Sequence, residues 1–157
     1  MTTLKRIMAG VDLSDYSAAV IEYAGELCRK TGAELVIVNV INQRELDAIT
    51  TVQMLAECKL SREEVVERKK VEHSSRINQL IDRFGLQDLP SRIVFRVGIP
   101  YQELIRAVQD EQVQMVVIGP KGRSNVPGLL FGSAAEKVFR HCPVPLLSIR
   151  GDIHART

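Results

Sequence analysis

The chain alternates between two kinds of segment, and this alternation limits the folds open to it more than any other feature. Five short runs rich in β-branched residues each predict a strand: Arg6–Val11, Leu35–Ile41, Arg92–Val97, Val113–Ile118 and Val144–Ile149. The second run is apolar at all but one position, and the fourth ends in four consecutive apolar residues. This pattern is typical of strands that are covered on both faces. The runs therefore predict a sheet buried between two layers.

The segments between these runs repeat apolar residues at the period of a helix. Helices are expected over Ser14–Thr31, Ser61–Phe84, Tyr101–Glu111 and Ser133–His141. Ser14 can cap the first helix, and Ser61-x-x-Glu64 and Ser133-x-x-Glu136 have the pattern of capping boxes. The connection from Asn42 to Ser91 is longer than a single crossover needs. We therefore expect an additional helical piece over Glu45–Leu60.

Strands and helices that alternate five times predict parallel strands joined by right-handed crossovers. The expected fold is a doubly wound α/β domain with helices on both faces and the strand order 3-2-1-4-5. No repeat or Gly/Ser linker divides the chain, so residues 1–157 are expected to form a single domain. Ligands bind such sheets beyond the carboxyl ends of the strands, where the strand order reverses. Polar or glycine-rich segments follow three strands there: Asp12 and Ser14 after the first, Asn42 after the second, and Gly119–Ser133 after the fourth.

Composition argues against several classes of function. The 157 residues include 21 basic and 19 acidic side chains, a net charge of +2 that is too even for a nucleic-acid-binding arm. No apolar run approaches the roughly 18 residues of a membrane span, and no signal-peptide pattern is present, so we expect a cytoplasmic protein without a membrane anchor. The three cysteines are widely spaced and are expected to be reduced. The three histidines stand at unrelated spacings, which argues against a metal site.

The segment after the fourth strand is rich in glycine. Four of the ten glycines, Gly119, Gly122, Gly128 and Gly132, fall within fourteen residues. Glycine lets backbone amides approach a ligand closely, and the helix that begins near Ser133 adds its own N-terminal amides. Together they would form a cradle for phosphate oxygens, to which Lys121 and Arg123 add positive charge. The alternative is a long turn whose glycines serve only the local backbone, with Ser133 as an ordinary helix cap.

The spacing Gly119-x2-Gly122-x9-Gly132-Ser133 resembles the nucleotide-binding signature of the universal stress protein family, in the branch that binds ATP. The similarity extends over nearly the whole chain. It includes the turn through Asp12 and Ser14, the segments Val38–Asn42 and Val97–Pro100, and Leu130–Pro145 at the end.

The resemblance implies a role for each matching residue. Asp12 would hold the ribose, and the backbone at Val40 would contact the adenine edge. The residues around the ribose and the phosphates would be Gly119, Gly122, Gly132 and Ser133. This chain departs from the usual pattern at Pro120, which stands where a small hydroxyl residue is common and removes one possible phosphate donor.

We therefore expect an ATP-binding regulatory module of the stress response, with or without Mg²⁺, that acts on an unidentified protein partner. A slow ATPase is one alternative, but hydrolysis needs Mg²⁺ ligands and a group that orients water. Only Asp12 and the loop serines could bind Mg²⁺, and no candidate base is found, so binding is better supported than turnover. The other alternative is a nucleotide-independent interaction module, which the intact glycines disfavour. A phosphoacceptor receiver would need an aspartate where Val97-Gly98-Ile99 stands, and a flavodoxin would need aromatic stacking, whereas aromatic residues make up only 4% of the chain.

The last strand carries an expectation about assembly. At the edge of the sheet, Val144–Ile149 would expose an apolar strand with unpaired backbone groups. Two-fold pairing with a second copy of the chain would cover it. The family resemblance implies the same homodimer. Because Pro145 lacks an N–H donor, this pairing is expected to be partial or confined to the later residues.

Overall fold

The computed structural model describes residues 3–57, 60–120 and 132–150. Within these ranges, five parallel strands form one sheet in the order β3-β2-β1-β4-β5. This confirms the predicted fold class and strand order, and β1 and β4 are neighbours where the order reverses. The strands are β1 (Arg6–Gly10), β2 (Glu34–Asn42), β3 (Ser91–Gly98), β4 (Met115–Ile118) and β5 (Leu146–Ser148).

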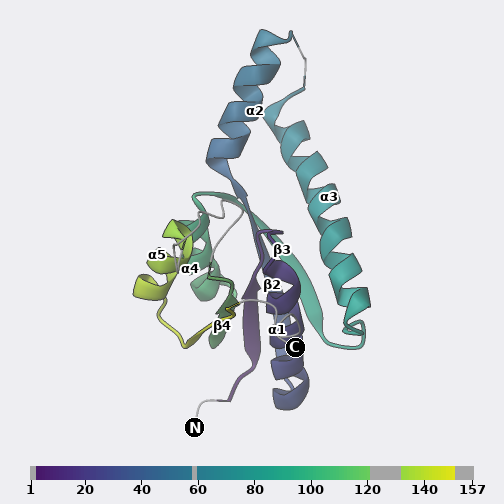
Figure 1. Ribbon diagram of the computed structural model, residues 1–157, viewed down its shortest axis with the longest axis vertical. Coiled ribbons are helices and arrows are strands. Elements are labelled where there is room, and N and C mark those ends of the chain that lie inside the picture. Colours follow the sequence, from purple (N-terminus) through teal and green to yellow (C-terminus); the bar gives the residue numbers. More distant parts are fainter. Residues whose placement is uncertain (1–2, 58–59, 121–131, 151–157) are drawn as a thin grey trace.

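Helices cover both faces of the sheet (Figure 1). On one face lie α1 (Ser17–Thr31) and α3 (Arg62–Arg83), and on the other lie α4 (Pro100–Asp110) and α5 (Ser133–His141). Successive residues of the central strands point to opposite faces, as the period of a strand requires. Ile7 packs in the layer of α1 and α3, whereas its neighbour Met8 packs in the layer of α4 and α5. Each central strand therefore needs apolar residues on both of its faces, which explains the apolar runs of β2 and β4.

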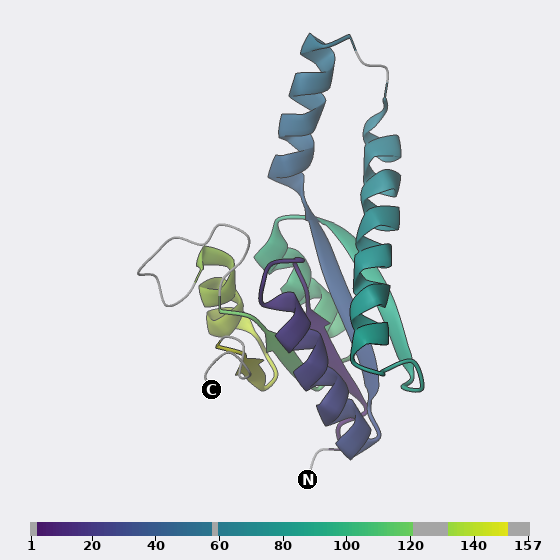
Figure 2. The same ribbon diagram turned by 45° about the vertical axis from the view of Figure 1, so that its right-hand side comes forward.

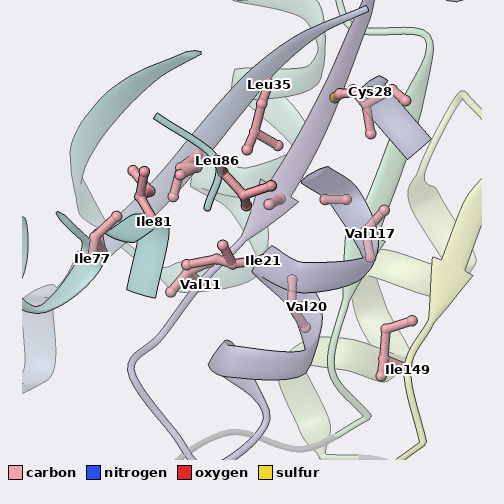
Figure 3. Packing of buried hydrophobic residues seen from close by; sticks show 14 of the residues in the cluster. Val11, Val20, Ile21, Cys28, Leu35, Ile77, Ile81, Leu86, Val117 and Ile149 are labelled. Carbon is pink, nitrogen blue, oxygen red and sulfur yellow. The ribbon is translucent and has the colours of Figure 1, made fainter. Parts of the chain in front are cut away.

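The layer of α1 and α3 is shown in Figure 3, where Ile21 of α1, Ile77 of α3 and Leu35 of β2 belong to one cluster of buried residues. Helix α1 lies close to the turn after α3. A Cβ atom added to Gly25 would stand only 2.5 Å from Cδ1 of the buried Leu86. Cys28 belongs to this layer, and its burial, together with the negative charge of Glu34, raises the pKa of the thiol to about 12.

The additional helical piece expected in the long connection is α2 (Gln43–Leu55). It begins directly at the end of β2 and forms a hairpin with α3 that extends beyond the carboxyl ends of the strands (Figures 1 and 2). Ile41, Leu46 and Val65 are buried at the base of this hairpin. The helices of the described ranges include none with the length and apolar character of a membrane span.

Candidate functional site

A cavity of about 420 Å³ lies at the carboxyl ends of β1, β2 and β4. The turn after β1 and the first residues of α2, α4 and α5 complete its wall. Cavities that hold small ligands and cofactors commonly measure roughly 300–1,000 Å³. The cavity is therefore large enough for such a ligand, and it lies where a doubly wound sheet binds one.

Five of the residues expected to contact a nucleotide line this cavity: Asp12, Val40, Gly119, Gly132 and Ser133. They come from the ends of three strands and the start of α5, and the strand order brings them together. Gly122 and Arg123 lie outside the described residues. The wall also contains aromatic and charged side chains to which the sequence patterns assigned no binding role: Tyr16, Arg44, Glu45, His73, Tyr101 and Lys137.

Asp12 organises the turn between β1 and α1. Its Oδ1 atom accepts hydrogen bonds from Ser14 N at 3.0 Å and from Ser17 Oγ at 3.4 Å. Leu13, between them, has a φ of 61°, which turns the chain before the helix can start. As a result α1 begins at Ser17, and the prediction that Ser14 caps it is wrong: the N-cap is Tyr16, without a side-chain bond.

A buried polar pair lies beneath this turn. Asn39 of β2 is fully buried, and its Nδ2 donates to Val11 O at 2.8 Å. Its Oδ1 lies 2.8 Å from Nδ1 of His73, a residue of α3 that is 4% exposed. Because Nδ2 of Asn39 is a donor, Oδ1 must accept, and Nδ1 of His73 carries the proton. The pair fixes α3 to the strand ends that carry Asp12.

The backbone at Val40 faces the cavity for a reason that lies in the strand register. The ladder of hydrogen bonds between β1 and β2 ends at the pair Gly10–Val38. There, the backbone N–H of Val11 donates to Val38 O at 2.9 Å. In a strand, the peptide groups of alternate residues point to the same side. The N–H and C=O of Val40 therefore point to the side of β1, beyond the place where β1 has turned away.

Gly119 and Gly132 are held close together. Gly132 N donates to Pro120 O at 2.8 Å, so the two ends of the glycine segment meet beside the cavity. Gly132 is the N-cap of α5, and Ser133 is its first helical residue. The helix has the predicted bounds, but the predicted capping box at Ser133 is wrong, because Gly132 is the N-cap and Glu136 pairs with Arg140 at 2.8 Å.

This start of α5 has a chemical consequence. Gly132 has no side chain and therefore cannot itself cap the first amides of the helix. The first turn of a helix leaves N–H groups without intrahelical acceptors, and the helix dipole adds partial positive charge there. Ser133, Ala134 and Ala135 of this turn all line the cavity. The wall formed by α5 is therefore suited to an anion.

The opposite wall begins at α4, where Ile99, Pro100 and Tyr101 line the cavity. An ion-pair cluster fixes this helix: Glu103 accepts from Arg96 Nε at 2.9 Å and from Arg106 at 2.6 Å. Burial alone would raise the pKa of Glu103, but the two hydrogen bonds and positive charges outweigh it and lower the pKa. Between α4 and α5, Nζ of Lys137 lies 4.8 Å from the centre of the Tyr101 ring.

The donor groups of the cavity wall bear on metal binding. Within residues 3–57, 60–120 and 132–150, no group of three histidine, cysteine, aspartate or glutamate side chains could hold an ion. The described side chains therefore do not supply a complete metal site by themselves.

Comparison with known proteins gives a consistent family match. Residues 3–150 match the sequence profile of the Universal stress protein family. Universal stress protein MJ0577 from Methanocaldococcus jannaschii is 23% identical over 153 residues, a match that covers 93% of this chain and 94% of the relative.

Solved structures show the same fold. The structure of MJ0577 has a TM-score of 0.79 at 19% identity, and the match covers 96% of this chain and 99% of that one. Universal stress protein UspA from Lactobacillus plantarum has a TM-score of 0.74 at 19% identity, with 96% and 100% covered. A universal stress protein solved in complex with cAMP has a TM-score of 0.67 at 18% identity, with 95% and 98% covered.

Proposed function

The chain belongs to the universal stress protein family, and on that premise we propose that it binds ATP in the cavity at the carboxyl ends of β1, β2 and β4. The observation that carries the proposal is the first turn of α5, which follows a glycine N-cap and whose residues line the same cavity as Asp12 and Val40. An anion site, a hydroxyl acceptor and a pair of backbone hydrogen-bonding groups correspond to the three parts of a nucleotide.

Each part of the nucleotide has a matching surface. The peptide group of Val40 is directed to the side of the cavity and can pair with the edge of adenine. Asp12 can accept hydrogen bonds from ribose hydroxyls while its Oδ1 holds the turn into α1. The amides at Gly132 and Ser133 can donate to phosphate oxygens, with Gly119 beside them. Gly122 and Arg123, in the segment between, are proposed to complete the phosphate cradle.

An adenine nucleotide is supported by one solved member of the family, which was crystallised with cAMP. Mg²⁺ is proposed to arrive with the triphosphate. The phosphate oxygens would supply most of its ligands, with Asp12 and the Ser133 hydroxyl as the protein groups available.

We propose that the bound nucleotide controls contacts with a protein partner of the stress response, and that the chain acts as a homodimer paired through β5. Binding, rather than turnover, is the proposed role. Asp12 and Glu45 are the carboxylates of the described cavity wall, and Asp12 already serves the turn into α1.

The test is to identify and count the nucleotide released when the purified protein is denatured, for the natural chain and for Gly132→Val. We expect adenine nucleotide in the natural protein and at least a tenfold loss of ATP affinity in Gly132→Val. The φ of Gly132 is −71°, a value that valine tolerates, so the loss would come from the side chain filling the phosphate space. Ala48→Val, an exposed change on α2, is the control. Unchanged ATP affinity in Gly132→Val would reject the site.

A further inference from the structure

Lys137 lies one helical turn beyond the proposed phosphate site. It follows Ser133 by four residues, so both side chains are on the same face of α5, and both line the cavity. The Cα–Cβ bonds of a helix tilt toward its N-terminus. The stem of Lys137 is therefore directed toward the first turn of α5, which follows the glycine N-cap.

The present partner of Lys137 is the ring of Tyr101, whose centre lies 4.8 Å from Nζ. Tyr101 is itself held, because its Oη accepts from Gln102 Nε2 at 3.1 Å. In the described parts of the chain, Lys137 has no carboxylate within ion-pair distance, whereas Arg140 on the next turn pairs with Glu136. A lone cation–π contact is weaker than a charge-assisted bond to a phosphate oxygen. Among the described residues, the ammonium group thus lies beside the cavity with a ring, and not a carboxylate, as its partner.

We propose that Lys137 is a phosphate ligand that leaves the Tyr101 ring when a nucleotide binds and sets how strongly the protein prefers longer phosphate chains. The inference rests on the nucleotide-binding function proposed above and deepens it. A point charge beside the phosphates strengthens binding with each added negative charge. It contributes nothing to adenosine, which has no phosphate.

A second cation of the cavity wall provides a control. Arg44 also lines the cavity, but it stands on α2, two residues after Asn42 at the end of β2. That strand carries Val40, the proposed contact of the base. Removal of the Arg44 charge therefore changes the net charge of the protein as removal of Lys137 does, but on α2 and not on α5.

The experiment measures the affinity of adenosine, AMP, ADP and ATP for the natural protein, Lys137→Gln, Lys137→Arg and Arg44→Gln by calorimetry. We expect Lys137→Gln to weaken ATP about tenfold, AMP less, and adenosine not at all, with most of the ATP affinity kept in Lys137→Arg. Arg44→Gln is expected to leave the ratio of ATP to adenosine affinity unchanged. An equal loss for adenosine and ATP in Lys137→Gln, or no loss for either, would overturn the inference.

A Tyr101 variant distinguishes the charge of Lys137 from its packing. If Lys137 acted only by packing on Tyr101, then Tyr101→Leu would reproduce the selective loss for ATP, and the inference would fail. We expect Tyr101→Leu to keep the preference for ATP over adenosine. If the natural protein bound neither adenosine nor ATP, the proposed function itself would be rejected, whereas normal ATP binding by Lys137→Gln would reject only the role of Lys137.

Discussion

Asn39 shows how a single polar side chain can determine the local structure of an apolar layer. It is fully buried in β2, where an amide without partners would be costly. Both ends of the amide are used, with Nδ2 bound to Val11 O and Oδ1 bound to His73 Nδ1. The interruption in the run Leu35–Ile41 is visible in the sequence, but the run itself does not identify the partner. A signal for the partner was present, because His73 precedes Ile77 by four residues on the apolar stripe of α3.

We predict that Asn39→Leu and His73→Leu each reduce the free energy of unfolding by about 1–3 kcal/mol, because each leaves a buried group of its partner without a hydrogen bond. The double variant removes both side chains, so the N–H of His73 is no longer left unpaired. The double variant should therefore lose clearly less free energy of unfolding than the two single variants added together. Urea denaturation of the three variants measures this coupling. Strictly additive costs would show that the two side chains do not depend on one another.

Helix starts in this chain separate what local sequence determines from what tertiary contacts determine. At α3 the hydrogen bond that the serine makes in a capping box is confirmed, since Ser61 Oγ accepts from Glu64 N at 3.1 Å. Ser14 and Ser133 have comparable local patterns, yet neither is an N-cap. In the first case the Asp12 carboxylate accepts the N–H of Ser14, and in the second Gly132, whose N–H donates to Pro120 O, is the N-cap. The first contact is local to the turn, whereas the second joins residues far apart in sequence and is not visible in a window of four residues.

Two ion-pair clusters join elements at opposite ends of the sheet. Glu103 of α4 bonds to Arg96 and Arg106, and Glu34 of β2 bonds to Arg6 of β1 and Arg92 of β3. Burial alone would raise the pKa of Glu34, but the bonds to Arg92 and Arg6 outweigh it, so the pKa is lowered, as it is at Glu103.

These lowered pKa values predict the response of the protein to acid. Both glutamates have an ordinary pKa of 4.5, below which the unfolded chain binds protons before the folded one does. Their contribution to stability is therefore complete above about pH 4.5 and is lost as the pH falls through the lower values of the folded state. We expect Glu103→Gln to be less stable than the natural protein at pH 7 and to lose less stability on acidification. Urea midpoints between pH 7 and pH 3 measure both effects, and parallel pH profiles for the two proteins would contradict the assignment.

The arrangement of the whole molecule was largely predictable, because it follows from alternation and from the handedness of crossovers. The same rules place Asp12, Val40, Gly119, Gly132 and Ser133 at neighbouring strand ends, and all five line one cavity. The remaining wall was not predictable in this way. Lys137 and Tyr101 meet only because α4 and α5 lie on the same face of the sheet, and His73 reaches the cavity only because α3 packs on the other face. These pairings depend on side-chain packing between elements distant in sequence.

The two edges of the sheet differ in a way that bears on assembly. The β3 edge carries Arg92 and Arg96, whose charged side chains bond to Glu111, Asp110 and Glu103 of the neighbouring helix and turn. Charged residues of this kind protect an edge from pairing. Strand β5 is short and lacks such charges, and Leu147 is 37% exposed in it. In the described ranges β5 pairs with β4 alone.

We therefore expect the proposed homodimer to depend on β5 and to be lost in Leu147→Glu, because two like charges would meet across a two-fold axis at this strand. Val97→Glu is the matched control, since Val97 is 39% exposed on the opposite edge strand, and it should leave the dimer intact. Sedimentation equilibrium at micromolar concentration gives the mass of each variant, and circular dichroism verifies that both are folded. A natural chain that sediments as a monomer would contradict the homodimer. A Leu147→Glu variant that remains a dimer would show that the two subunits meet elsewhere than at β5.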